Sequence, residues 1–152
     1  MHETKITLLL DIYIIYEYVC LMRKWKSKNH AKYNLGYHFI WCSKYRIEVL
    51  KDGVDIRLKE LLIEKSLDKN WSIEQMEILP DHVHIFIKTN PSDSPTHIIN
   101  QLKGYTSRIL RKEFSQLRTK LPTLWTRSYF VESVGHISES TIKKYIEEQK
   151  KR

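Results

Sequence analysis

Hydrophobic and polar positions along the chain follow two spacings, which predict strands that alternate with helices. Residues 33–45 are dense in aromatic and other strand-forming side chains, which is typical of a central strand. Apolar residues recur at three-to-four spacing from Val54 to Asn70 and predict a helix that Asp52 can cap. Residues 71–79 alternate in the way expected of a second strand.

The rest of the chain predicts two more strands and two more helices. The apolar run 83–87 lies between turn signals and predicts a third strand, and residues 124–131 predict a fourth. A helix-start signal precedes a helix expected at about 96–117, and a capping serine opens a last helix that runs from 138 to the end. The expected buried stripe of the first of these helices is Ile98, Ile99, Leu102, Tyr105, Ile109, Leu110 and Phe114.

This order of elements predicts an α+β fold. Strand, helix, strand, strand, helix, strand (βαββαβ) is the order of a ferredoxin-like or RNA-recognition-like antiparallel sheet, here followed by a C-terminal helix. Because many unrelated functions share this fold, the order alone does not name an activity.

The N-terminal residues carry a different pattern. Residues 5–22 are rich in Ile, Leu, Tyr and Val, but Asp11 and Glu17 argue against a membrane span, and no basic segment precedes them as in a secretion signal. We expect residues 1–28 to be an extension of unknown role, with an added helix or strand, before a single domain at 29–152. Met22 opens a basic stretch typical of an N-terminus, so translation from Met22 is an alternative.

Composition adds an anionic partner to this picture. The 152 residues include 26 Lys and Arg against 18 Asp and Glu, a formal net charge of +8. Nucleic acid is the natural partner, ahead of a membrane surface, and the alternative is a protein that happens to be basic. Cys20 and Cys42 allow at most one disulfide and show no metal-type spacing, which fits a reducing cytoplasm.

The excess positive charge is concentrated on the helix at 96–117 and just after it. Glu113 is the sole acidic residue between Ile98 and Leu124. A charged helix face is often merely solvated, but a face with one sign of charge favours a surface that follows phosphates.

Two pairs of residues are candidates for chemistry. His82 and His84 share one face of the third strand, so their imidazoles could bind one metal ion, although two half-exposed polar residues are the alternative. Tyr145 and Gln149 lie four residues apart and project from nearly the same face of the last helix. The alternative there is an exposed helix whose tyrosine packs on the core.

Four motifs, taken together, resemble one known family. They are His82-Val83-His84, Leu102-Lys103-Gly104, the segment 124–131 (Leu-Trp-Thr-Arg-Ser-Tyr-Phe-Val) and the segment 141–149 (Thr-Ile-Lys-Lys-Tyr-Ile-Glu-Glu-Gln). Their order and spacing over about residues 29–149 closely resemble the TnpA transposases of insertion sequences, which are single-tyrosine HUH enzymes of the IS200-like family. Ser128 and His136 stand where that family commonly has glycine.

The resemblance implies a DNA transposase that cleaves and rejoins single-stranded DNA at insertion-sequence ends through a 5′-phosphotyrosine intermediate. It implies Tyr145 as the nucleophile and His82, His84 and Gln149 as ligands of a divalent metal, Mg²⁺ or Mn²⁺. It also implies DNA hairpins at the element ends as substrates and a homodimer in which the tyrosine helix of one subunit completes the histidine site of the other. The candidate phosphate contacts are Lys103, Arg108, Arg111, Arg118 and Arg127.

No nucleotide cofactor is expected, because covalent transfer conserves the phosphoester bond and the four glycines form no phosphate-cradling motif. The remaining histidines are expected to be structural or on the surface; they are His2, His30, His38, His97 and His136.

Two alternatives remain. A domesticated relative would use the same residues on repeated genomic palindromes. A non-catalytic, RNA-recognition-like binding module would bind nucleic acid without a covalent adduct, but the first strand lacks the aromatic pattern of such modules.

Overall fold

The computed structural model describes residues 26–28, 30–134, 143–144 and 146–149, and the chain divides into two compact units, Met1–Asn34 and Leu35–Arg152. In the first unit, β1 (Lys26–Lys28) and β2 (Ala31–Tyr33) form an antiparallel hairpin. The turn contains His30, whose φ of 68° lies in the left-handed region. This hairpin is absent from the elements that the sequence predicted, and the helix or strand predicted at 5–22 lies outside the described residues.

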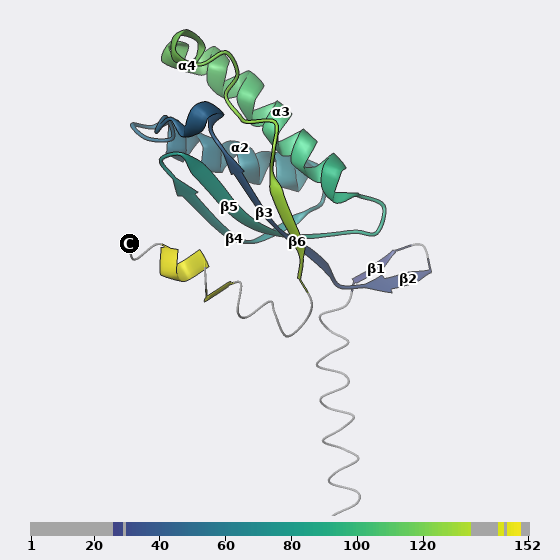
Figure 1. Ribbon diagram of the computed structural model, residues 1–152. Coiled ribbons are helices and arrows are strands. Elements are labelled where there is room, and N and C mark those ends of the chain that lie inside the picture. The colour runs from purple at the N-terminus through teal and green to yellow at the C-terminus, as the bar shows by residue number, and fades with distance from the viewer. Residues whose placement is uncertain (1–25, 29, 135–142, 145, 150–152) are drawn as a thin grey trace, which may run out of the picture. The chain divides into compact units, whose positions relative to one another are not determined.

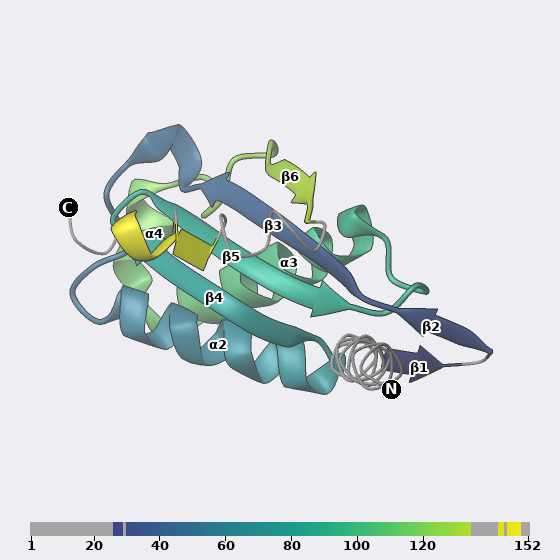
Figure 2. The same ribbon diagram turned by 90° about the horizontal axis from the view of Figure 1, so that it is seen from below.

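The second unit contains a four-stranded antiparallel sheet with two longer helices on one face (Figures 1 and 2). The strands lie in the order β4-β5-β3-β6. The elements follow along the chain as β3 (Leu35–Cys42), the short 3₁₀ turn η1 (Lys44–Arg46), α2 (Val54–Asp68), β4 (Ser72–Leu79), β5 (His82–Thr89), α3 (Pro95–Glu113), α4 (Ser115–Lys120) and β6 (Phe130–Ser133). The predicted α+β class and the βαββαβ order are confirmed.

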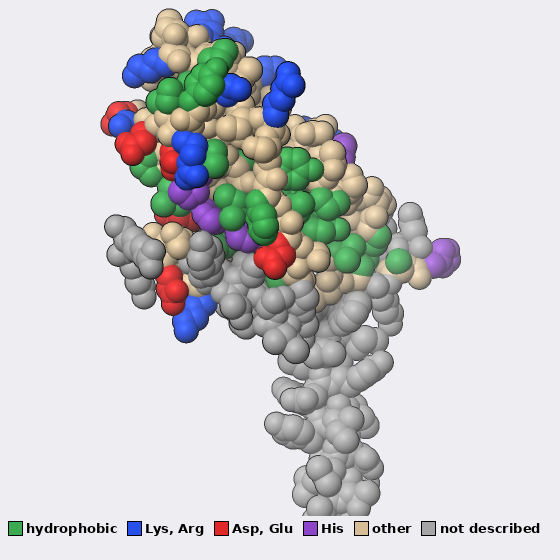
Figure 3. Space-filling model, in the orientation of Figure 1, with side chains coloured by type: hydrophobic (Ala, Val, Ile, Leu, Met, Phe, Trp, Pro, Cys, Tyr) green, Lys and Arg blue, Asp and Glu red, His purple; other side chains and the backbone are tan. Residues whose placement is uncertain are grey.

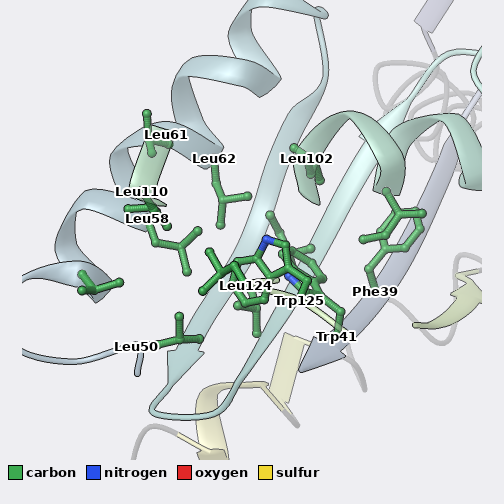
Figure 4. Packing of buried hydrophobic residues seen from close by; sticks show 14 of the residues in the cluster. Phe39, Trp41, Leu50, Leu58, Leu61, Leu62, Leu102, Leu110, Leu124 and Trp125 are labelled. Carbon is green, nitrogen blue, oxygen red and sulfur yellow. The ribbon is translucent and has the colours of Figure 1, made fainter. Parts of the chain in front are cut away.

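Alternation along the central strand β5 separates the two faces of the sheet. Val83, Ile85 and Ile87 are fully buried and belong to the core that α2 and α3 cover. His82, His84 and Phe86 point to the other side, which we call the open face of the sheet. Figure 4 shows how leucines of the helices meet the aromatic residues of the strands inside the core.

The helix α3 starts where the sequence predicted and ends earlier. The Ser94 side chain accepts a hydrogen bond from the backbone N–H of His97 at 3.1 Å, and Pro95 occupies the first turn. The prediction of one helix over 96–117 is wrong at Phe114, whose φ of −113° and ψ of 96° separate α3 from α4. The change of direction brings Leu117 and Leu121, which are 1% and 2% exposed, into the same core. No helix in the described part of the chain is long and apolar enough to cross a membrane.

The fourth strand is shorter than predicted, because β6 begins at Phe130 and not at residue 124. Leu124 and Trp125 are adjacent and both pack into the same core cluster, whereas consecutive side chains of a regular strand point to opposite faces of the sheet. Trp125 packs edge-on against Trp41, with ring centroids 5.9 Å apart, and its backbone makes an isolated bridge to Ser43. The predicted strand is therefore wrong over 124–129, where backbone pairing is limited to the bridge at Trp125 and two hydrogen bonds, from Lys44 N–H to the Leu124 carbonyl and from Thr126 N–H to the Cys42 carbonyl.

Candidate functional site

The histidine pair, His82 and His84, lies on the open face at the start of β5. The two ring centroids are 5.1 Å apart, and the ring planes are inclined by 64°. Their strand neighbours on β3 are Cys42 and Ile40, so the pair occupies the middle of the sheet and not an edge. The predicted proximity of the two imidazoles is confirmed, while their role as metal ligands stays a prediction.

The His82 ring is oriented by a carboxylate beside it. Its Nδ1 lies 2.5 Å from Oδ1 of Asp81, and Oδ2 of Asp81 accepts a hydrogen bond from Nε of Arg46 at 3.1 Å. Burial alone would raise the pKa of the Asp81 carboxyl, but the hydrogen bonds with His82 and Arg46 hold it below its usual range. A carboxylate on Nδ1 keeps the proton there, so Nε2 is the nitrogen of His82 with a lone pair for a metal ion.

The His84 ring is buried and neutral. It is 4% exposed, and burial, together with the neighbouring His82 and His38 rings, lowers its pKa to about 4. The neutral imidazole is the form that binds metals. Nδ1 of His84 lies 3.3 Å from Nε2 of His38, a buried histidine that was expected to be structural or on the surface. Burial also lowers the pKa of His38, although the charge of Glu132 opposes this effect.

The donor set fits a divalent cation. The imidazoles of His82 and His84 lie side by side; the Asp81 carboxylate lies at Nδ1 of His82, and the His38 ring lies at Nδ1 of His84. A carboxylate at the second ring nitrogen is usual for a histidine that binds a metal. Among the described residues, no three His, Cys, Asp or Glu side chains gather as a potential metal site, and the predicted third ligand, Gln149, carries an amide oxygen.

The C-terminal helical residues lie on the same side of the sheet as the histidine pair. Figures 1 and 2 both show this segment across the sheet from α2 and α3. Ile146 is fully buried, and Nζ of Lys143 lies 3.6 Å from Oε2 of Glu74 on β4. Gln149 is half-buried in this segment, and the predicted nucleophile, Tyr145, lies outside the described residues.

A second feature lies in the helix layer, where basic side chains line a groove of about 430 Å³. We call it the basic groove; its lining residues are Gly104, Ser107, Arg108, Arg111, Lys112 and Arg118. Three of the five predicted phosphate contacts therefore meet in one place, and the structure adds Ser107 and Lys112 to them. Figure 3 shows Lys and Arg side chains at the α3–α4 end of the second unit and histidines gathered further down.

Two interactions keep this groove positive and ordered. Glu113, the one acidic residue of α3, is held by the Arg57 guanidinium on α2, with Nε and Nη2 at 2.8 and 3.1 Å from its two oxygens. The paired carboxylate is thus directed toward α2. Nη1 of Arg111 donates to the carbonyl of Leu121 at 3.0 Å, which restrains one cation before any ligand binds.

The other two predicted phosphate contacts lie outside this groove. Nζ of Lys103 donates to the carbonyls of Thr126, Arg127 and Ser128 at 2.6, 3.2 and 3.4 Å, and burial lowers its pKa. Lys103 therefore supports the loop that precedes β6. The Arg127 side chain belongs to an exposed residue of that loop. Contact of Arg127 with DNA stays a prediction, whereas a contact of Lys103 with phosphate would compete with these three hydrogen bonds.

A ferredoxin-like sheet that carries a histidine pair on one face and a basic groove over its helices indicates a protein that acts on nucleic acid. Residues 31–149 match the family described as "Transposase IS200 like", and the chain belongs to this family. It is therefore a transposase, an enzyme class that cleaves and transfers DNA. The match begins within β2, and the predicted domain boundary at residue 28 stays a prediction.

Individual relatives cover most of the chain. The ISDra2 transposase TnpA of Deinococcus radiodurans is 35% identical over 134 residues, which are 87% of this chain and 96% of the relative. The transposase for insertion sequence element IS200 of Salmonella typhimurium is 31% identical over 127 residues, 82% of each protein.

Two solved structures share the fold. The crystal structure of a candidate transposase from Deinococcus radiodurans R1 is 33% identical, with a TM-score of 0.68 over 82% of this chain and 97% of the other. A REP-associated tyrosine transposase bound to a REP hairpin aligns with a TM-score of 0.54 over 79% of this chain and 70% of the other. Because that protein is 15% identical, it supports the fold alone.

Proposed function

We propose that this transposase cleaves and rejoins single-stranded DNA at the ends of an insertion sequence, with Tyr145 as the nucleophile. The observation that carries the proposal is the histidine pair on the open face, with the C-terminal helical residues on the same side of the sheet. Residues 143–144 and 146–149 flank Tyr145 in the sequence and are helical, which supports the placement of a nucleophile on that helix.

The proposed reaction consists of two transesterifications. The phenolic oxygen of Tyr145 attacks a phosphorus of the DNA, the bond to the 3′-oxygen breaks, and the proton lost by the phenol is balanced by the one gained at the new 3′-hydroxyl. A second 3′-hydroxyl then attacks the 5′-phosphotyrosine and releases the phenol. The number of phosphoester bonds is unchanged, so no nucleotide triphosphate is needed. A free phenol has a pKa of about 10, so the site must assist its deprotonation.

His82, His84 and Gln149 would hold a divalent cation, Mg²⁺ or Mn²⁺, which supplies charge neutralisation and orientation at the attacked phosphate. The imidazoles are prepared for this role, because Asp81 orients His82 and burial keeps His84 neutral. Two imidazole nitrogens and one amide oxygen, without a thiolate, are a donor set compatible with these hard cations.

The basic groove is the proposed site for the DNA backbone. Its four cations, Arg108, Arg111, Lys112 and Arg118, can each meet one phosphate of a DNA hairpin near the element end. The REP-associated tyrosine transposase, whose fold this chain shares, is bound to a REP hairpin, and a hairpin is the ligand proposed here. Because α3 covers one face of the sheet and the histidine pair lies on the other, the anchored and the cleaved parts of the DNA would contact different sides of the protein.

The proposed assembly is a homodimer in which the tyrosine helix of one subunit completes the histidine site of its partner, and the proposed compartment is the cytoplasm. Function as a domesticated relative would use the same residues. The 35% identity to an insertion-sequence transposase, against 15% to the REP-associated one, favours the insertion-sequence role.

The test uses single-stranded oligonucleotides from the DNA that flanks the gene, incubated with protein and Mg²⁺ or Mn²⁺ and separated on a denaturing gel. We expect a metal-dependent covalent adduct that is absent from Tyr145→Phe and retained by the matched control Tyr129→Phe. Tyr129 is a suitable control because its ring packs against the core and its hydroxyl lies 3.1 Å from Oγ1 of Thr96 at the start of α3, the helix on the other face of the sheet from the histidine pair. An adduct that persists in Tyr145→Phe would refute the assigned nucleophile, and DNA bound without any adduct would favour a binding module.

A further inference from the structure

His38 contacts His84 across two paired strands of the open face. His38 on β3 pairs with Phe86 on β5, and His84 pairs with Ile40, so the two histidines are diagonal neighbours on the same face. Nε2 of His38 lies 3.3 Å from Nδ1 of His84. The rings are nearly parallel, at 21°, with centroids 5.5 Å apart, and both residues are 4% exposed. The contact is therefore shielded from solvent.

The chemistry of this contact allows two arrangements of one proton. A neutral imidazole has one N–H and one nitrogen lone pair, so two neutral rings bond when one donates and the other accepts. If His38 donates from Nε2, His84 accepts at Nδ1, carries its own proton on Nε2 and has no lone pair left for a metal ion. If His84 donates from Nδ1, its Nε2 has the lone pair that a ligand needs.

The surroundings of His38 hold its ring in place. The Phe130 ring on β6 meets it edge-on, with centroids 6.3 Å apart and planes at 72°. Glu132 on β6 is the strand neighbour of His38 on the side away from His84. With strands on both sides, His38 has little freedom to move away from His84.

We propose that His38 is a positioning residue that accepts the Nδ1–H of His84 through its Nε2 and so holds His84 in the tautomer able to bind the cation. The proposal rests on the metal site of the proposed function. It gives the two ligands similar supports, since Asp81 lies at Nδ1 of His82 as His38 lies at Nδ1 of His84. The two supports differ in kind, because one is a charged carboxylate and the other a neutral ring.

The first experiment measures the tautomer directly, by long-range ¹H–¹⁵N correlation spectra of the metal-free full chain. We expect the proton of His84 on Nδ1 in the wild type. In His38→Ala it should shift toward Nε2, the nitrogen that carries it in most free imidazoles. His38→Gln offers an amide oxygen as a substitute acceptor and should keep the proton on Nδ1. A wild-type His84 with its proton on Nε2 would overturn the proposal.

The second experiment measures Mn²⁺ binding without DNA, from the electron paramagnetic resonance signal of free Mn²⁺. Loss of a partner that orients a ligand typically weakens metal binding about 10- to 100-fold, which we expect for His38→Ala. His38→Gln should recover most of the affinity, and His97→Ala, an exposed histidine beside Asp93, should match the wild type. Thermal unfolding shows whether each variant is folded. If His38→Ala fails to fold, the Mn²⁺ affinity and the tautomer of His38→Gln test the proposal.

The two ideas fail in different ways. Equal Mn²⁺ affinity in wild type, His38→Ala and His38→Gln would overturn the role of His38 while leaving the metal site in place. A wild-type chain that does not bind Mn²⁺ would overturn the metal site and, with it, this inference.

Discussion

Loss of the cations in the basic groove should weaken DNA binding in a way that depends on salt. The perturbation is Arg108→Ala with Arg118→Ala, two exposed residues that line the groove. A protein that neutralises one duplex phosphate changes log K by about 0.9 for each tenfold change in salt. Relative to 1 M salt, one contact therefore raises the affinity about 8-fold at 0.1 M salt, and two contacts raise it about 60-fold.

The assay is a titration of a fluorescent hairpin from the element end, repeated from 50 to 200 mM salt. The slope of log K against log salt should become less steep by about 1.8 in the double variant. Arg111 is left in place because it also donates to the carbonyl of Leu121, so its loss would disturb the fold as well. The matched control is Lys51→Ala with Lys59→Ala, which removes the same charge from exposed positions outside the groove.

The cleavage site offers an internal check on the same variant. Because the groove and the histidine pair lie on opposite sides of the sheet, adduct formation at saturating DNA should stay near the wild-type level. An unchanged slope in the Arg108, Arg118 variant, or an equal change in the Lys51, Lys59 control, would refute the groove as the site for the backbone. The excess positive charge would then act as a diffuse field.

Two further predictions concern stability. Gly36→Ala should destabilise the chain by about 1–3 kcal/mol, because a Cβ there would lie 2.6 Å from Cε2 of the buried Phe86 ring; urea unfolding measures this. Gly104→Ala is its control: nothing lies within 4 Å of that Cβ, and Ala in a helix should raise stability by up to about 1 kcal/mol. Lys103→Met should lower the unfolding free energy by about 1.5–3 kcal/mol, since its ammonium bonds three carbonyls, without changing the salt slope of DNA binding. A changed slope at unchanged stability would show that Lys103 contacts phosphate after all.

The prediction of the fold succeeded where one periodicity extended over a whole element. The helix at Val54–Asp68 matches the predicted range closely, because it buries one regular face. The strand at Ser72–Leu79 also matches its predicted range, although a register shift between Ile73 and Gln75 interrupts the alternation and its residues are only partly buried. The prediction failed at Phe114, where the chain changes direction between α3 and α4, and over 124–129, where the adjacent side chains of Leu124 and Trp125 both pack into the core. Local pattern cannot reveal such places, since the cause lies in residues far along the chain.

For the site, local spacing placed His82 beside His84, because alternation along one strand needs no partner. Pairing of the strands brought in His38, which is 46 residues from His84 in the sequence and meets it through the register of β3 with β5. The contact of Asp81 with His82 was predictable from the sequence, since Asp81 directly precedes His82 and its carboxylate can reach Nδ1 of that ring. His38 carried no such local signal.

By itself, the sequence determined the order of strands and helices, the histidine pair, the excess of positive charge and the resemblance to IS200-like transposases. These properties depend on neighbouring residues, on composition or on motifs that can be read along one chain. Tertiary structure alone decided which cations share a groove, that Lys103 supports a loop, and that His38 is the partner of His84. Each of these depends on contacts between distant segments, which form when the sheet and its helices pack around one core.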